Sequence, residues 1–158
     1  MKRASAVAVL LLVVALFGGV VEGKVYEKCE VRALLKAGLK KSTDTTIEKI
    51  VCHVSQSSNY DSSVVNTVNV TQDDGSVEKW TMYGLFQITQ HFCTGKDGLC
   101  KIDCKDLIDD DLTDDIQCVE DIKRTFLKNP TGANKIYREI IPKLFTPNCP
   151  KSILSDCD

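Results

Sequence analysis

Five aspartates crowd a seven-residue stretch of the chain: Asp109, Asp110, Asp111, Asp114 and Asp115. Repulsion among so many carboxylates is costly without a cation, although the dipole at a helix start favours some negative charge. Calcium prefers six to eight hard oxygen ligands, including carboxylates and backbone carbonyls, in a flexible shell. The stretch therefore predicts a calcium site, and the alternative is a solvated acidic helix start.

The eight cysteines are the second group of residues with evident chemistry: Cys29, Cys52, Cys93, Cys100, Cys104, Cys118, Cys149 and Cys157. An even number behind a secretory leader indicates four disulfides formed in an oxidising compartment. Zinc binding is the competing use, but only His53 and His91 could assist and the sequence has no Cys-x-x-Cys pair. Eight cysteines allow about 105 pairings, so their number does not assign the partners.

The leader is residues 1–23, which have the pattern of a secretory signal peptide. Lys2 and Arg3 precede an apolar run, and the small residue Gly23 suits cleavage. An uncleaved anchor is the alternative, but the run is short for a span of about 20 residues and is broken by paired glycines. We expect a secreted mature chain, 24–158, that forms one domain, acts as a monomer and has no membrane contact after cleavage.

The net charge of the mature chain limits the kinds of partner that it is expected to bind. Loss of Lys2, Arg3 and Glu22 leaves 18 basic and 21 acidic residues, a formal charge of −3. That acidity argues against a nucleic-acid partner and against electrostatic attraction to anionic bacterial surfaces.

Four segments have apolar residues at helical spacing and must position these groups. We predict helices over 27–37, with Gly38 as a left-handed cap, from Thr43 or Asp44 to about Ser57, and over 113–127. A fourth is predicted over 133–141, ending at Pro142. The segment 61–92 is rich in β-branched residues and contains the turn signal Asp74-Gly75, which predicts a small antiparallel sheet. The fold class is therefore α+β, with a mostly helical lobe and a small β lobe.

Three segments together resemble the c-type lysozymes and α-lactalbumins of glycoside hydrolase family 22. They are 24–30 (Lys-Val-Tyr-Glu-Lys-Cys-Glu), 83–88 (Tyr-Gly-Leu-Phe-Gln-Ile) leading to Phe92-Cys93, and 104–118 with the acidic run. The order of the cysteines matches across the whole mature chain. The resemblance implies a lysozyme-like fold with disulfides Cys29–Cys157, Cys52–Cys149, Cys93–Cys104 and Cys100–Cys118, the last two linking the β lobe to the third helix.

The same resemblance locates a pair of catalytic carboxylates in active members, and this chain lacks both. The family's general acid, five residues after the second cysteine, is Ser57, and its aspartate before the Tyr-Gly pair is Met82. A retaining glycosidase needs one protonated and one ionised carboxyl group about 5 Å apart. A serine hydroxyl is too weak an acid, and a thioether does not ionise. We expect no lysozyme-type hydrolysis.

A glycosidase with displaced carboxylates is the alternative function. Asp61 lies four residues after Ser57, and Glu78 lies four before Met82, so either could share a face with a lost group if the local structure continues regularly. Such a muramidase would need an acid with a raised pKa in the cleft. A weaker third possibility, a regulator of a glycosyltransferase, lacks the family's contact residues, which are Ser155 and Gln56 here.

The sugar cleft of the family is partly changed. Gln87 is kept, whereas Thr89 and Phe92 replace the family's asparagine and tryptophan, and Trp80 lies nearby. Because aromatic stacking and amide hydrogen bonds hold pyranose rings, these four are candidates for binding peptidoglycan or chitin fragments. The alternative is that Trp80, Gln87 and Phe92 simply pack the β lobe.

By the same resemblance, calcium is bound structurally by the side chains of Asp109, Asp114 and Asp115 and the carbonyls of Asp106 and Asp111. Asn69-Val70-Thr71 is an acceptor for N-glycosylation, and an unmodified surface asparagine is the alternative. Insertions after Tyr60 and after Gly132 border the cleft, where they cover it or form a partner surface. The predicted function is a non-enzymatic glycan-binding or protein-binding glycoprotein of antimicrobial defence or reproduction.

Overall fold

The computed structural model describes residues 23–128, 135–150 and 153–157. The predicted signal peptide therefore lies outside the described residues except for its last residue, Gly23. Within these ranges, no helix is long and apolar enough to cross a membrane.

Four helices form one lobe, and they confirm the periodicity of the sequence. They are α1 (Lys28–Gly38), α2 (Asp44–Ser57), α3 (Leu112–Lys128) and α4 (Lys135–Phe145). At the start of α1, Glu27 and Glu30 form a reciprocal capping box, and at the start of α2 the Thr43 hydroxyl accepts a bond of 3.2 Å from the Thr46 amide. The starts of both helices are thus fixed by local polar side chains.

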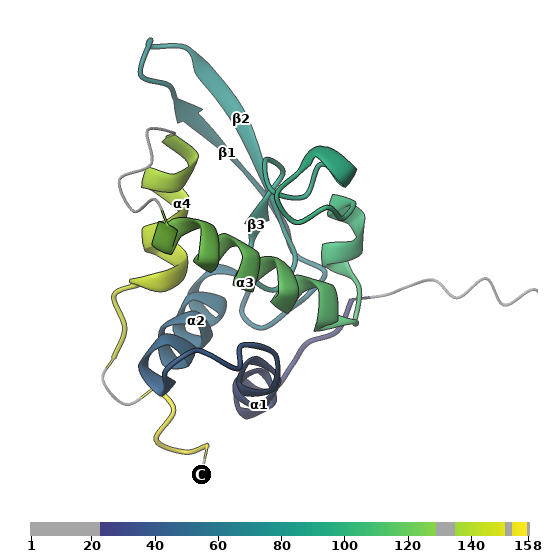
Figure 1. Cartoon of the computed structure of the whole chain (residues 1–158), viewed down its shortest axis with the longest axis vertical. Helices are drawn as coiled ribbons and strands as arrows, with labels where there is room; N and C mark the ends of the chain where they lie inside the picture. Colours follow the sequence, from purple (N-terminus) through teal and green to yellow (C-terminus); the bar gives the residue numbers. More distant parts are fainter. Residues whose placement is uncertain (1–22, 129–134, 151–152, 158) are drawn as a thin grey trace, which may run out of the picture.

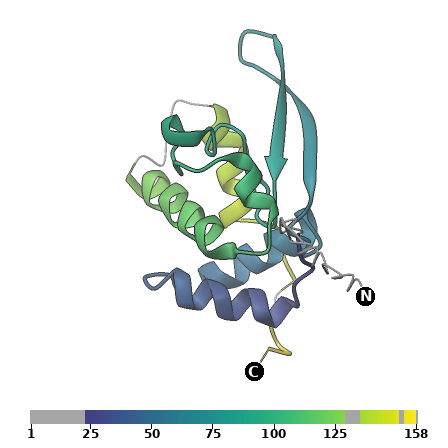
Figure 2. The ribbon, with the colours of Figure 1, turned by 90° about the vertical axis from the view of Figure 1, so that its right-hand side faces the viewer.

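The predicted antiparallel sheet has three strands in the order β1-β2-β3, namely β1 (Val65–Thr71), β2 (Val77–Tyr83) and β3 (Ile88–Thr89). β1 and β2 form a hairpin in register from Val65 opposite Tyr83 to Thr71 opposite Val77. Its turn uses the predicted glycine, because Gly75 has a φ of 84°, a value that favours glycine. Figures 1 and 2 show the hairpin projecting well beyond the helices. The fold class is α+β, as predicted.

One apolar core joins the two lobes. The buried faces of all four helices meet the buried side of β2 and the segment after it. The largest fully buried side chains include Leu35, Ile47, Ile50, Trp80, Phe86, Ile122 and Ile141. A continuous core therefore holds the helices and the sheet together.

The predicted end of the fourth helix at Pro142 is wrong, since α4 continues to Phe145. A proline inside a helix costs about 3 kcal/mol because it removes one hydrogen bond and crowds the preceding turn. Ile141, Leu144 and Phe145 are nonetheless buried, and each such burial contributes about 1.5–3 kcal/mol. Packing of the last turn against the core therefore outweighs the proline. The predicted start at Ala133 lies outside the described residues.

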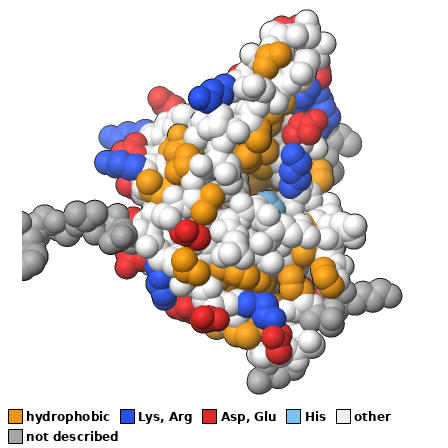
Figure 3. Space-filling model, turned by 180° about the vertical axis from the view of Figure 1, so that it is seen from behind, with side chains coloured by type: hydrophobic (Ala, Val, Ile, Leu, Met, Phe, Trp, Pro, Cys, Tyr) orange, Lys and Arg blue, Asp and Glu red, His pale blue; other side chains and the backbone are white. Residues whose placement is uncertain are grey.

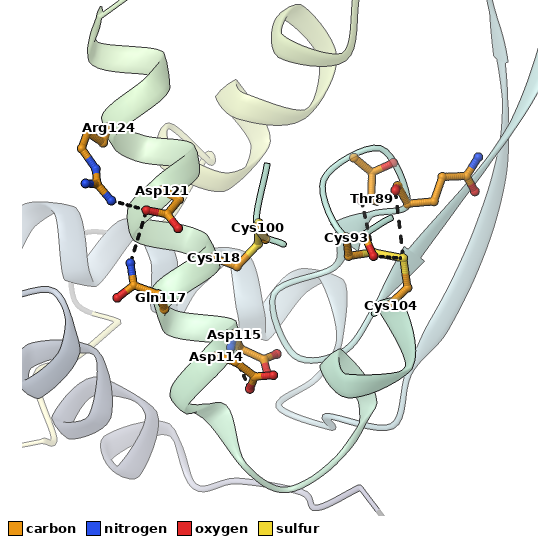
Figure 4. Close-up of a disulfide and its surroundings, with 11 residues drawn as sticks. Thr89, Cys93, Cys100, Cys104, Asp114, Asp115, Gln117, Cys118, Asp121 and Arg124 are labelled. Carbon is orange, nitrogen blue, oxygen red and sulfur yellow. Dashed lines mark hydrogen bonds and ion pairs between the residues drawn. A yellow bond between two sulfur atoms is a disulfide. The ribbon is translucent and has the colours of Figure 1, made fainter. Parts of the chain in front are cut away.

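All four implied disulfides are present. Cys93–Cys104 does not reach α3, contrary to expectation, because it joins the end of the β3 segment to the short helix η2 (Cys104–Ile108). Only Cys100–Cys118 fastens this loop region to α3, as Figure 4 shows. Two further bridges hold α1 and α2 to the C-terminal segment after α4.

Gly38 is not the left-handed cap that the sequence predicts. It is the last residue of α1, its φ is not positive, and Leu39 is the C-cap. A Cβ atom at Gly38 would lie 2.4 Å from Cγ2 of Ile116 on α3. The glycine is needed because the two helices approach each other closely at this point.

Replacing Gly38 by alanine will therefore destabilise the protein, although alanine favours a helix by about 1 kcal/mol over glycine. The clash with Ile116 costs about 1–3 kcal/mol, so we expect a lower free energy of unfolding in urea. In an Ile116→Ala background, where the opposing methyl is gone, the same change should become neutral or stabilising. An equal loss in both backgrounds would show that close packing is not the reason for this glycine.

Candidate functional site

Ser57 and Met82 line one pocket, so the fold brings together the two positions at which the family resemblance expects catalytic carboxylates. The pocket has a volume of about 310 Å³ and lies between α2, the hairpin and α4. An adjoining pocket of about 410 Å³ shares several residues with it. Figure 3 shows this face hollowed below the hairpin, where apolar side chains, a histidine and basic side chains gather. We call the first of these the central pocket; it is lined by His53, Ser57, Asn66, Thr67, Val68, Met82, Gln87, Ile140 and Lys143.

No carboxylate lines the central pocket or its neighbour among the described residues. The charged side chain that they share is a cation, Lys143 on α4. Sequence reasoning missed Lys143 as a site residue, and it considered His53 only as a zinc ligand. The sequence did contain a signal for Lys143. It lies three residues after Ile140, and this helical spacing places both side chains on one face of α4.

The polar groups at the floor of the pocket are already bonded within the protein. The Ser57 hydroxyl donates to the backbone carbonyl of His53 at 2.7 Å, and His53 Nε2 lies 3.0 Å from the carbonyl oxygen of Phe86. Burial lowers the pKa of His53, so the ring is neutral at pH 7. Because the hydroxyl does not face the imidazole, this arrangement is not a serine nucleophile with a histidine base.

The two displaced carboxylates considered above do not line the central pocket or its neighbour. Asp61 follows two residues with positive φ, so α2 does not continue to it, and its carboxylate accepts bonds of 2.8 and 2.6 Å from the amide and hydroxyl of Ser63. Glu78 lies on β2 about 13 Å along the strand from Met82. Its carboxylate accepts a bond of 2.8 Å from Gln72 and lies 3.5 Å from His91.

Gln87 is in the central pocket, but its amide is used to hold the backbone. Its oxygen accepts a bond of 2.8 Å from Asn66, and its nitrogen donates to the carbonyls of Gly84 at 2.8 Å and Val64 at 3.1 Å. The side chain is buried. Gln87 therefore ties the start of β1 to the turn after β2, and in this arrangement it has little capacity left for a sugar.

The other three glycan candidates lie in the core of the β lobe. Trp80, Thr89 and Phe92 are 1%, 0% and 3% exposed. The Trp80 ring packs edge-on against His91 with 5.2 Å between ring centroids. These positions favour the packing interpretation over sugar stacking, because a stacked sugar needs an exposed aromatic face.

The acidic run forms a turn between η2 and α3. The Asp111 amide donates to the Asp109 carboxylate at 2.8 Å, and the Thr113 amide donates to the Asp111 carboxylate at 3.0 Å. The carbonyl of Asp110 accepts a bond of 2.6 Å from the Tyr26 hydroxyl, which joins the turn to the N-terminal segment. Figure 4 shows Asp114 and Asp115 side by side in the first turn of α3.

Asp115 is the exceptional member of this run, since only 1% of it is exposed. Its Oδ1 atom accepts no hydrogen bond from the described residues. Burial, assisted by the charges of Asp114 and Asp109, raises the pKa of Asp115 to about 9. Burial also raises the pKa of Asp114. A buried carboxylate with an unfilled oxygen is an arrangement that a cation would satisfy.

The remaining predicted ligand residues are close in sequence but not preassembled. The Asp106 carboxylate accepts a bond of 3.3 Å from the Asp103 amide, which caps η2. Among the described residues, no three carboxylate, histidine or cysteine side chains converge as a metal cluster. The donor set of the run, hard oxygens from side chains and backbone, still matches calcium better than a metal that prefers nitrogen or sulfur.

These features agree with the relationship found by comparison with known proteins. Residues 24–134 match the model of the C-type lysozyme/alpha-lactalbumin family. The chain is 39% identical over 109 residues to an alpha-lactalbumin of Tachyglossus aculeatus aculeatus, an alignment that covers 63% of this chain and 79% of that protein. It is 36% identical over 131 residues to lysozyme C-3 of Sus scrofa, with coverage of 78% and 80%.

A third relative is sperm acrosome-associated protein 5 of Bos taurus, which is 33% identical over 117 residues. The alignment covers 70% of this chain and 70% of that protein. Among solved structures, a lysozyme from Litopenaeus vannamei superposes with a TM-score of 0.60 at 29% identity, over 85% of this chain and 97% of that one. The fold is therefore lysozyme-like. The chain belongs to the C-type lysozyme/alpha-lactalbumin family.

The raised pKa of Asp115 makes the metal-free protein sensitive to pH. The unfolded group ionises near pH 3.8 and the folded group near pH 9, so the folded state binds the extra proton between these values. The contribution of protonated Asp115 to the free energy of unfolding is therefore present at low pH and is lost as the pH rises from about 4 towards 9.

Asp115→Asn removes that titration, so in EDTA the variant should gain stability relative to the parent protein as the pH rises from 5 to 8. Urea unfolding at each pH measures the difference. The exposed Asp97 in η1 (Gly95–Asp97) supplies the matched control, since Asp97→Asn should leave the slope unchanged. A difference between parent and Asp115→Asn that is constant with pH would contradict this account.

Proposed function

We propose that this chain is a secreted, non-catalytic member of its family that binds calcium and recognises a glycan or a protein partner. The observation that carries the proposal is the central pocket itself. Ser57 and Met82 occupy the positions of the catalytic pair there, and no described carboxylate lines the pocket. Without a proton donor and an anion on opposite sides of a glycosidic bond, the oxocarbenium-like transition state is not stabilised.

The glycosidase with displaced carboxylates has little support in the geometry. Asp61 and Glu78 are bonded to neighbours outside the pocket. Their positions favour roles in the loop after α2 and in the hairpin.

Calcium binding is the second part of the proposal. The side chains of Asp109, Asp114 and Asp115 and the carbonyls of Asp106 and Asp111 would supply the ligands, and water would complete the shell. The support is the unfilled, buried oxygen of Asp115 together with the oxygen-rich turn around it. The ion would act structurally, because a ligand that binds only the folded state stabilises it by mass action.

The remaining parts of the proposal follow from the surface and the leader. Residues 1–23 would direct secretion, and the mature domain, 24–158, would act as a monomer in antimicrobial defence or reproduction. Asn69 is exposed on β1, where an attached glycan would extend from the hairpin. Because Trp80, Thr89 and Phe92 are buried, a peptidoglycan or chitin fragment would be held mainly by the lining of the central pocket.

The oxidised protein should release no products from peptidoglycan or chitin oligosaccharides, with or without calcium, under conditions in which an active lysozyme does. Chromatography of the reducing ends measures this. Ser57→Ala should leave the result unchanged, since the serine has no role in proton transfer. Cleavage above background that disappears in Asp61→Asn or Glu78→Gln would instead establish a displaced active site.

A further inference from the structure

Four buried polar side-chain atoms of the described residues have no hydrogen-bond partner, and two of them belong to one cross-strand pair in the β lobe. They are Nε1 of Trp80 on β2 and Nε2 of His91 just after β3, whose rings meet edge-on. A third, Oγ1 of Thr89, lies two residues before His91. A buried nitrogen without a partner costs free energy because water does not reach it. Neither the central pocket nor the acidic run accounts for this cluster.

The carboxylate of Glu78 on β2 lies next to the unsatisfied nitrogen of His91. Its Oε1 atom is 3.5 Å from His91 Nε2, which is longer than the separation of about 2.7–2.9 Å in a hydrogen bond between charged groups. Its Oε2 atom accepts a bond of 2.8 Å from the side-chain nitrogen of Gln72 in the hairpin turn. This bond orients the carboxylate and leaves Oε1 towards His91. The two side chains are therefore in place but are not hydrogen-bonded.

The other charged side chains near this pair are directed or bound elsewhere. Among the described residues, Glu78 is the carboxylate that pairs with the imidazole ring. Lys79 projects from the opposite face of β2, because side chains alternate along a strand. β1 places uncharged residues opposite this part of β2. On η2, which packs against β2, both charged residues are bound to Asp103, Lys105 through its ammonium group and Asp106 through its carboxylate.

We propose that Glu78 and His91 form a pH-sensitive clasp between β2 and the segment 88–92, and that the clasp closes when His91 is protonated. A neutral imidazole has one N–H donor, whereas the protonated ring has two, so Nε2 then donates to Oε1 of Glu78. Histidine changes charge between about pH 5 and 8, so a mildly acidic compartment would operate the clasp.

The clasp acts on one wall of the central pocket without being part of its lining. The Gln90 amide donates to the Thr81 carbonyl at 2.9 Å, and Thr89 pairs with Met82, which lines the pocket. The two-residue strand β3 has few other ladder contacts with β2. Closing the clasp therefore holds β3 more firmly against β2 and restrains the wall at Met82.

The first test uses Trp80, which is the only tryptophan of the chain and packs against His91. A protonated imidazole in contact with an indole quenches its emission. The fluorescence of the oxidised protein in EDTA should therefore fall as the pH is lowered from about 8 to about 5. His91→Gln should abolish this fall. Glu48→Gln, at an exposed carboxylate on α2, should leave it unchanged.

Hydrogen exchange of the Gln90 amide tests whether Glu78 closes the clasp. Relative to Glu78→Gln, the parent protein should gain about two- to fivefold in protection at Gln90 over the same fall in pH, as expected for a partly exposed ion pair. The variant is suited to this comparison because the side chain of Glu78 is 44% exposed, so its replacement leaves the core intact.

Three results would overturn the proposal. They are an emission that stays constant over this pH range, a fall in emission that persists in His91→Gln, and equal gains of Gln90 protection in the parent protein and in Glu78→Gln. The exchange measurement decides the question even where His91→Gln does not fold, since it depends on the exposed partner alone.

Discussion

The buried carboxylate of Asp115 is the constraint on which the junction of the two lobes depends. Its Oδ1 atom lies so close to the turn after β2 that a Cβ atom on Gly84 would come within 3.4 Å of it and within 1.7 Å of the Leu107 carbonyl oxygen. Gly84 also has a φ of 71°, so glycine is required twice over. The Tyr-Gly pair, η2 and the first turn of α3 thus meet at one buried carboxyl group, whose pKa burial raises to about 9.

The central pocket is lined by residues other than Asp115 and Leu107, but it is connected to that junction through Gly84, whose carbonyl accepts a hydrogen bond from Gln87. Gln87 bonds to Asn66, Gly84 and Val64, and Asp73 bonds to α4. These interactions position the lining without requiring any catalytic group. The pocket is therefore held in shape by residues other than Ser57 and Met82, and among the described residues its lining includes the cation Lys143 and no carboxylate. The residues that hold the pocket in shape therefore differ from those that would determine its chemistry.

Local patterns predicted the helices and the sheet, because periodicity and turn residues report on short-range structure, whereas the pairing of the four bridges was implied only by the family resemblance. The errors arose where tertiary packing decides. Pro142 remains inside α4 because the following turn is buried, and Gly38 serves contact with Ile116 instead of a cap. Lys143 was missed because it is far in sequence from Ser57. The burial of Trp80 and Phe92 could not be predicted either, because the type of a side chain does not reveal whether it points into the core or towards solvent.

Calorimetric titration of the oxidised protein with calcium at pH 7, in two buffers of different ionisation enthalpy, tests the central role of Asp115 most directly. The account predicts binding of one ion with release of about one proton, because the carboxylate is protonated in the metal-free protein and must ionise to coordinate the ion. Asp115→Asn should lose both the binding heat and the proton release. Calcium binding with no proton release, or binding that survives Asp115→Asn, would contradict it.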